Sequence, residues 1–271
     1  MQYIFVVFFS FISFGPLLFE FHSKVLSKES RSKLIGVCSY YRNIDSSNLP
    51  LPILKPQGSY IGIKNTIVEQ QEYFYNKYRN AKTRINKEKI IAEASLYITT
   101  QLLNQIFPHW YGTKWSFDGY TSVPNKGKVG CSYFVSTTLL HAGFNLNRYS
   151  LAQQGPVSEA KSLLIKGTLL EIEIGYEFEK FIPAIKRKCK EGLYFIGLGH
   201  SHVGFLYYRE KEVYFIQSSY GRSMQVEIDY ANESDILTGF GEFTLVPITN
   251  NIPLIQKWVT GEEIIIVKGK D

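Results

Sequence analysis

Apolar residues change their spacing along the chain, and each change marks a different kind of segment. Tyr3 to Phe19 is an almost unbroken apolar run. After Asn86, which can cap a helix, apolar residues recur at helical spacing until Pro108. These are Ile90, Ile91, Ala94, Tyr97, Ile98, Leu102 and Ile106. The second pattern predicts one long amphipathic helix that packs on the body of the protein.

A second helix is predicted to begin at Cys131 and to end at Gly143, which is typical of a helix C-cap. Its apolar stripe consists of Phe134, Val135, Thr138, Leu139 and Ala142. Another helical stretch is predicted over residues 157–165. Helical segments therefore dominate the first part of the chain after the leader.

The pattern then turns to strands rich in β-branched and aromatic residues. We predict strands over residues 193–198, 202–208, 213–218, 223–229 and 240–248. Charged residues from Arg209 to Glu212 separate the second strand from the third and indicate a tight hairpin. Helices first and an antiparallel sheet afterwards predict an α+β fold.

These changes divide the chain into four predicted parts. Residues 1–23 form an apolar leader, 24–85 a lead-in or linker rich in turn signals, 86–249 the catalytic domain and 250–271 a C-terminal extension. The leader fits a signal peptide or a short membrane anchor better than a full membrane span. It lacks a preceding Lys or Arg and a clear cleavage site, so a buried segment is the alternative. We expect an exported protein.

Charge and cysteine content narrow the classes of function. The net charge of +6 is spread along the chain, and Lys186-Arg187-Lys188 is the one short basic run, so nucleic-acid binding is not predicted. Three cysteines are too few for a disulfide scaffold and lack the pairing of a zinc site, so we expect no metal and no cofactor. Cys38 and Cys189 either pair or are buried thiols, and both leave Cys131 free.

Cys131 follows a glycine and opens an amphipathic helix, which is the placement that a thiol nucleophile requires. The positive end of the helix dipole stabilises a thiolate and lowers the pKa of the thiol. Free backbone N–H groups at the same helix end can hold the oxyanion of a tetrahedral intermediate. The alternative interpretation of a lone cysteine is a buried structural thiol.

A base for Cys131 comes from the predicted hairpin. If Tyr208 pairs with Val213, His202 lies opposite Ser219, Gly204 lies opposite Gln217, and these four side chains share one face. Gln217 can then accept a hydrogen bond from the imidazole and orient it, with Ser219 as the fallback.

The opposite face of this hairpin, with Val203, Phe205 and Tyr207 against Phe215, is predicted to be core. Three other histidines compete with His202 for the role of base. His200 and His109 lie in predicted loops, and His141 lies nearly three helical turns from Cys131. We therefore expect His202 to be the base.

This set of motifs resembles the NlpC-type cell-wall peptidases of the papain-like superfamily. The resemblance rests on Cys131-Ser132 at a helix start, Ser201-His202-Val203-Gly204 at a strand start, and the strand Val213 to Ser219 that contains Gln217. An upstream Trp110-Tyr111-Gly112-Thr113 segment is similar to the loop that lines the cleft of that family. The resemblance implies a papain-like fold, with N-terminal helices packed on an antiparallel sheet or half-barrel, and metal-free hydrolysis of an amide in peptidoglycan stem peptides through an acyl-enzyme.

The match covers roughly residues 105–225 and departs from the family at several points. Gly130 stands where the family has Asp, Tyr133 replaces a small residue, and the segment between Leu151 and Gly192 reads as an insert. These departures leave open an acyltransferase, a toxin-like amidase or deamidase acting on a protein, or a wall-binding module without turnover. We expect six residues to contact the substrate, although the aromatic ones are equally consistent with core packing. They are Trp110, Tyr111, Trp115, Asp118, Ser132 and Ser201.

Overall fold

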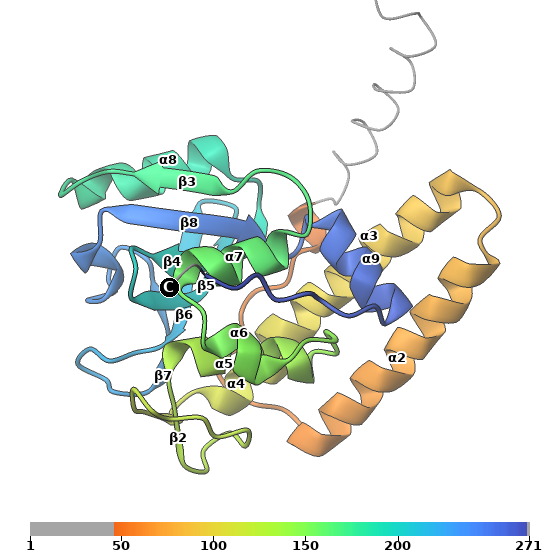
Figure 1. The fold of residues 1–271 in the computed structure, drawn as a ribbon, viewed down its shortest axis with the longest axis horizontal. Coiled ribbons are helices and arrows are strands. Elements are labelled where there is room, and N and C mark those ends of the chain that lie inside the picture. Colours follow the sequence, from red (N-terminus) through yellow and green to blue (C-terminus); the bar gives the residue numbers. More distant parts are fainter. Residues whose placement is uncertain (1–45, 270–271) are drawn as a thin grey trace, which may run out of the picture. The chain divides into compact units, whose positions relative to one another are not determined.

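The computed structural model describes residues 46–269, and within them it contains an antiparallel six-stranded sheet covered by helices (Figure 1). The helical segments are η1 (Ser46–Asn48), α2 (Tyr60–Asn80), α3 (Arg84–Gln101), the π-helix η2 (Leu102–Ile106), α4 (Phe107–Trp110), α5 (Cys131–His141), α6 (Arg148–Ala152), α7 (Pro156–Leu164), η3 (Phe178–Lys180), α8 (Phe181–Lys188), η4 (Leu237–Gly239) and α9 (Ile252–Thr260). The strands are β1 (Lys114–Trp115), β2 (Lys128–Val129), β3 (Leu170–Glu173), β4 (Gly192–Leu198), β5 (His202–Arg209), β6 (Glu212–Ser218), β7 (Val226–Tyr230) and β8 (Glu242–Pro247). The predicted α+β class is confirmed.

The large sheet has the strand order β3-β8-β4-β5-β6-β7, and its side chains alternate between two cores. On β4, Leu193 and Phe195 join the core beneath α3, α5 and α9, which we call the helical core. Tyr194 and Ile196 join a second core that includes α8, which we call the back core. Because both faces of β4 are buried, the strand reads as an unbroken apolar run rather than an alternating one.

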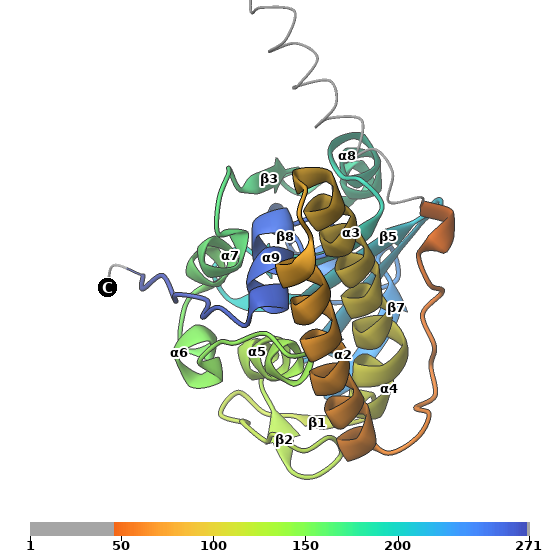
Figure 2. The same ribbon diagram turned by 90° about the vertical axis from the view of Figure 1, so that its right-hand side faces the viewer.

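Part of the expected linker is a helix of the folded body. α2 begins after Ser59, whose hydroxyl accepts from the Gly62 N–H at 3.1 Å, and it buries Ile67 and Phe74 in the helical core. Figure 2 shows α2, α3 and α9 side by side. Within the described residues, the boundary expected near residue 86 lies at the junction of two helices that pack on each other, α2 and α3. Periodicity alone missed α2 because its outer face also carries apolar residues such as Ile61 and Val68.

The expected C-terminal extension is also part of the core. α9 buries Leu254, Ile255, Trp258 and Val259 in the helical core. The indole N–H of Trp258 donates to the carbonyl of Ala142 at 2.7 Å, at the end of α5. The following Gly143 has a φ of +91°, and a Cβ there would lie 2.8 Å from the indole nitrogen, so only glycine fits.

The helix predicted from Asn86 to Pro108 forms in a modified way. It begins two residues earlier, after Thr83, whose hydroxyl accepts from the Asn86 N–H at 3.2 Å, and a π-helical segment interrupts it at Leu102–Ile106. The expected insert after Leu151 folds as α7, β3 and α8, and β3 becomes an edge strand of the sheet.

The apolar leader and Cys38 lie outside the described residues. Among residues 46–269, none of the helices combines the length and apolar character needed to cross a bilayer.

Candidate active site

The nucleophile predicted from the sequence stands at the first position of α5. β2 leads into Gly130, which is the N-cap of α5 and provides no side-chain cap. The loop before it folds back, because the Gly130 N–H donates to the carbonyl of Gly119 at 2.7 Å. A Cβ at Gly130 would lie 3.1 Å from the carbonyl of Phe117, so a larger residue would displace this loop. The open helix start leaves backbone N–H groups beside Cys131 that are suited to an oxyanion.

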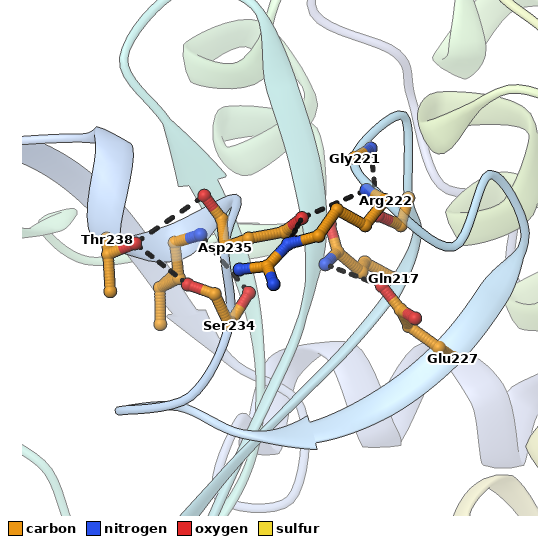
Figure 3. Close-up of polar contacts among 9 residues, drawn as sticks. Gln217, Gly221, Arg222, Glu227, Ser234, Asp235 and Thr238 are labelled. Atoms are coloured by element: carbon orange, nitrogen blue, oxygen red, sulfur yellow. Dashed lines mark hydrogen bonds and ion pairs between the residues drawn. The ribbon is translucent and has the colours of Figure 1, made fainter.

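His202 and Gln217 are joined as the hairpin register predicts. β5 and β6 pair with Tyr208 opposite Val213, and Nε2 of His202 lies 2.8 Å from Oε1 of Gln217. The amide nitrogen of Gln217 lies 3.5 Å from a carboxylate oxygen of Glu227, as Figure 3 shows. Because a carboxylate only accepts, the amide nitrogen must face Glu227 and the amide oxygen must face His202. The Nε2 atom of His202 therefore carries the proton, and Nδ1 is left as the basic nitrogen.

Cys131 meets β5 where that strand separates from β6. The ladder between the two strands ends at the pair Phe205–Ile216, whereas β6 remains paired with β7 as far as Ser218. Near this gap the backbone N–H of Val203 acts on the thiol of Cys131 and favours its lower pKa, against the larger effect of burial. Tyr220 lies near both residues, since its ring is 5.1 Å from that of His202 and the proximity of Cys131 contributes to its raised pKa.

One detail of the predicted hairpin is wrong. Phe215 belongs to the back core and lies on the same face as Gln217, because residues two apart on a strand point the same way. Its ring lies 6.3 Å from that of His202. A Cβ at Gly204 would lie 2.8 Å from the Phe215 ring, so Gly204 makes room for an aromatic neighbour of His202.

Burial controls the protonation of Cys131 and His202. It raises the pKa of the Cys131 thiol, the charge of Glu159 raises it further, and the hydrogen bonds from Val203 and Ser132 act in the opposite direction. Burial also lowers the pKa of His202 to about 4, against the smaller effect of Gln217. The expected lowering of the thiol pKa by the helix start is therefore outweighed, and the resting pair is a neutral thiol beside a neutral imidazole.

Glu159 on α7 is a further titratable group at the site. The whole residue is buried, and neither carboxylate oxygen has a hydrogen-bond partner. Burial raises the pKa of Glu159 to about 8, and the Ser132 hydroxyl acts in the opposite direction although it forms no hydrogen bond with either oxygen. The signal in the sequence is that Glu159 shares the apolar face of α7 with Pro156, Ala160 and Leu163. A charged residue in an apolar stripe could have marked it.

The alternatives to His202 and Gln217 are occupied elsewhere. Ser219 is buried, and its hydroxyl accepts from the Gly221 N–H at 3.1 Å instead of facing the imidazole. His141 is bonded to the Tyr60 hydroxyl at 2.9 Å, and burial lowers its pKa to about 4. His200 is exposed in the turn before β5, and the half-buried His109 contacts the carbonyl of Gln57 through its ring.

The residues predicted to contact substrate fall into two groups. Trp110 is in the helical core, where its indole donates to the Tyr60 hydroxyl at 2.6 Å, so its prediction as a cleft residue is wrong. Tyr111 is half-buried, and its hydroxyl is enclosed without a partner. The other four remain accessible: Trp115 and Ser132 are half-buried, and Asp118 and Ser201 are exposed.

A shallow cavity lies in the loop before Cys131. It has a volume of about 360 Å³ and is lined by Ser116, Asp118, Gly119, Tyr120, Thr121, Gly127 and Lys128. Asp118 is held by the hydroxyl of Ser116, and this bond lowers the pKa of its carboxyl. Since Gly119 also accepts from Gly130, this cavity shares its backbone with the segment that positions the nucleophile.

Tyr220, which was not predicted from the sequence, lies beside His202. Its ring is 5.1 Å from that of His202 in an edge-to-face arrangement and 6.1 Å from that of Trp115. Burial raises the pKa of Tyr220, and the proximity of Cys131 adds to the effect. In the sequence, its position shortly after the predicted strand that contains Gln217 could have indicated that Tyr220 lies near His202. Tyr220 therefore links Trp115, the accessible aromatic residue of the upstream loop, to the imidazole.

Asp235 holds the loop that carries Tyr220. Its carboxylate accepts from the Arg222 N–H at 2.9 Å and lies 3.5 Å from the Arg222 guanidinium, as Figure 3 shows. A Cβ at Gly221 would lie 2.6 Å from this carboxylate, which explains the glycine after Tyr220. Asp235 itself follows Ser234, whose hydroxyl accepts from the Leu237 N–H and starts a short helical turn.

The arrangement combines a thiol at an open helix start, an oriented imidazole and a held aromatic loop. Among residues 46–269, no group of histidine, cysteine and acidic side chains is arranged to hold a metal ion. Comparison of the chain with models of known protein families and with curated proteins gave no match.

Proposed function

We propose that the protein is a cysteine hydrolase that cleaves an amide bond, with Cys131 as nucleophile, His202 as base and Gln217 as the residue that orients the base. The observation that carries the proposal is the pair of contacts around β5. Nε2 of His202 lies 2.8 Å from Gln217, and the backbone N–H of the next residue, Val203, favours a lower pKa of the Cys131 thiol. Nucleophile, base and orienting group in this order are the arrangement that acyl transfer requires.

The reaction follows from the neutral resting pair. As the sulfur attacks the substrate carbonyl, its proton passes to Nδ1 of His202, and the oxyanion is held by N–H groups at the start of α5. Collapse of the intermediate expels the amine, which takes the proton from the imidazolium. Water then loses a proton to Nδ1 and attacks the thioester, which releases a carboxylic acid and restores the thiol.

The substrate class is inferred from the resemblance and the surface beside the site. Trp115 and Tyr220 offer adjacent aromatic faces, and the cavity of about 360 Å³ in the loop before Cys131 is open to solvent and partly polar. Such a surface suits an extended peptide with polar side chains. We therefore propose peptidoglycan stem peptides, reached by export of the protein, as the first substrate to test.

The test incubates purified peptidoglycan with the wild type and with Cys131→Ala, and fragments are identified by mass. We expect new amine and carboxyl termini with the wild type and a loss of about 10³-fold or more with the variant. Cys189→Ala is the matched control, because Cys189 is the other free thiol of the described chain and lies in the back core region. Equal activity of Cys131→Ala and wild type on every acyl substrate would overturn the proposal. Activity on protein or peptide amides but not on peptidoglycan would overturn only the substrate.

A further inference from the structure

Arg148, the first residue of α6, is a buried cation without an anionic partner. It is 6% exposed, and its guanidinium donates to the Thr137 hydroxyl on α5 and to the backbone carbonyls of Tyr120 and Thr121. Within residues 46–269, none of these hydrogen-bond partners carries a charge. Removing a cation from water is unfavourable unless a charged group compensates it. The arginine therefore calls for an explanation other than stability.

The guanidinium of Arg148 organises three tyrosine rings. Its central carbon lies 4.5 Å from the centre of the Tyr149 ring and 5.5 Å from that of Tyr133, which is within the range of a cation–π contact. The ring of Tyr133 is in turn 6.0 Å from that of Tyr149 and 6.2 Å from that of Tyr120. The rings come from the loop between β1 and β2, from α5 and from α6. We call these three residues the tyrosine row.

The tyrosine row faces solvent although its supports are buried. Tyr120 is 61% exposed and Tyr149 is 51% exposed, and Tyr133 between them is half-buried. Arg148 contacts the Tyr149 ring directly and holds Tyr120 through the backbone carbonyl of that residue. Rings that are already fixed lose less conformational entropy when a ligand stacks on them. The row is therefore a preorganised aromatic surface.

A polar cavity adjoins the tyrosine row. The cavity of about 360 Å³ in the loop before Cys131 is lined by Tyr120, and Asp118 and Lys128 line it as well. Asp118 can accept hydrogen bonds and Lys128 can donate them, and both side chains are exposed. Through Tyr120, the aromatic faces and these polar groups belong to one surface.

This surface lies on a flank of α5 that is turned away from the nucleophile. Tyr133 follows Cys131 by two residues, which is about 200° around an α-helix. Thr137, which accepts from Arg148, follows Tyr133 by four residues and shares its side of the helix. A ligand on the tyrosine row would therefore lie about one helix diameter, roughly 10 Å, from the sulfur. Such a place suits a part of the substrate that is not cleaved.

We propose that the tyrosine row and the adjoining cavity bind a neutral oligosaccharide, the glycan strand that carries the peptide on which the hydrolase acts. A sugar ring has a face of C–H groups and a rim of hydroxyls. It therefore matches aromatic faces that lie beside hydrogen-bonding side chains. The inference rests on the proposed function for the identity of the attached peptide.

Charge argues against a nucleic acid, whose bases could also stack on tyrosine rings. Affinity for nucleic acids comes mainly from lysine and arginine side chains that contact phosphates. Here the guanidinium of Arg148 is buried and bonded to the protein, and Lys128 is the one cation among the residues that line the cavity. Asp118 in the same lining would repel a phosphate.

The experiment is a calorimetric titration of the full chain with the β-1,4-linked hexamer of N-acetylglucosamine, in a Cys131→Ala background that cannot turn over. We expect saturable binding. Tyr120→Ala and Tyr149→Ala should each weaken it about threefold to tenfold, because each removes an aromatic face. Tyr149→Phe keeps the face and should bind within about twofold of the parent. Tyr176→Ala is the matched control, since Tyr176 is a fully exposed tyrosine outside the row.

No saturable binding of the hexasaccharide would overturn the inference, and so would equal affinities of Tyr149→Ala and Tyr176→Ala. Tighter binding of a thymidine hexanucleotide than of the hexasaccharide would assign the row to a nucleic acid and would also overturn it. Hydrolysis of free stem peptides by the wild type separates the two proposals. Hexasaccharide binding by a protein that cleaves no amide would remove only the proposed function. Cleavage of free stem peptides without hexasaccharide binding would remove only this inference.

Discussion

Two carboxylates flank the proposed catalytic pair, and the structure treats them in opposite ways. Glu227 on β7 is half-buried and lies at the end of a chain in which His202 and Gln217 are bonded to one another. Glu159 on α7 is fully buried and has no hydrogen-bond partner. The first arm fixes the orientation of the imidazole, and the second leaves a group free to change its charge. The two carboxylates therefore differ in kind: Glu227 belongs to a hydrogen-bonded chain on β5, β6 and β7, whereas Glu159 on α7 is buried without a partner.

The largest expected effect is the dependence of the free energy of unfolding on pH that the buried carboxyl of Glu159 produces. The folded carboxyl has a pKa of about 8 against 4.5 when exposed, so between these values the folded state holds a proton that the unfolded chain releases. The contribution is present below pH 4.5 and is lost as pH rises through 8, by on the order of 4 kcal/mol. Urea unfolding across this range should show that Glu159→Gln lacks the loss. A variant that loses stability in parallel with the wild type would show that Glu159 ionises freely in the folded protein.

In the same experiment, protonation of His202 makes the free energy of unfolding change with pH in the opposite direction. Its pKa is lowered from 6.5 to about 4, so the unfolded chain binds more protons between these values and stability falls as pH drops through that window. This effect is present in both the wild type and Glu159→Gln. The difference between the two proteins therefore isolates the carboxyl. The low pKa also predicts that the acid limb of kcat/KM lies near pH 4, well below that of an exposed histidine.

The second largest effect concerns the hydrogen-bonded chain of His202, Gln217 and Glu227. Gln217→Ala removes the acceptor of the His202 N–H and leaves that donor buried and unpaired, because His202 is only 1% exposed. We expect kcat to fall about 10-fold to 100-fold with little change in KM, since orientation of the base matters mainly in the transition state. Steady-state kinetics with Gln153→Ala, an exposed glutamine, provides the control. An unchanged kcat would mean that packing against Phe215 and Tyr220 alone orients the ring.

The smallest expected effect concerns the loop that carries Tyr220 and is held by Asp235. Asp235→Ala removes the acceptor of the Arg222 N–H and frees the loop that carries Tyr220. KM should rise about threefold, because an exposed charge-assisted contact contributes about 1 kcal/mol or less. Arg222→Ala is the matched control, since it keeps the backbone bond and loses only a guanidinium whose side chain is 91% exposed. Equal effects of the two variants would assign the role to the ion pair instead.

The sequence was sufficient where one local pattern determined one element. Cys131 at the helix start, the register that pairs Tyr208 with Val213 and the partner of His202 followed from periodicity and a short turn. The period of a strand fixes which residues share a face, so a correct turn was enough to place Gln217. The same rule shows why the prediction for Phe215 was wrong. Phe215 is two residues from Gln217 on the same strand, so its side chain points to the same face as that of Gln217.

The rest depended on contacts between distant segments. Nothing local to α7 indicates that Glu159 comes near Ser132, and nothing local to Trp110 indicates that Tyr60 receives its indole N–H. The thiol pKa was misjudged for the same reason, since burial of Cys131 is produced by strands and helices far from it in sequence. The prediction of a lowered pKa from the helix start assumes that the thiol is in contact with water. When the thiol is buried, the loss of solvation raises its pKa by more than the helix dipole lowers it.

The bond between Trp258 and Ala142 also sets an order of events during synthesis. The two residues are 116 positions apart, and the bond closes the end of the helix that begins with Cys131. A nascent chain that has emerged only as far as β8 has every residue of the proposed catalytic set but not the helix that secures α5. Domains fold as they leave the ribosome, from the N-terminal side onward. Cys131 therefore acquires its final environment only after α9 has left the ribosome, which is later than the emergence of every residue of the proposed catalytic set.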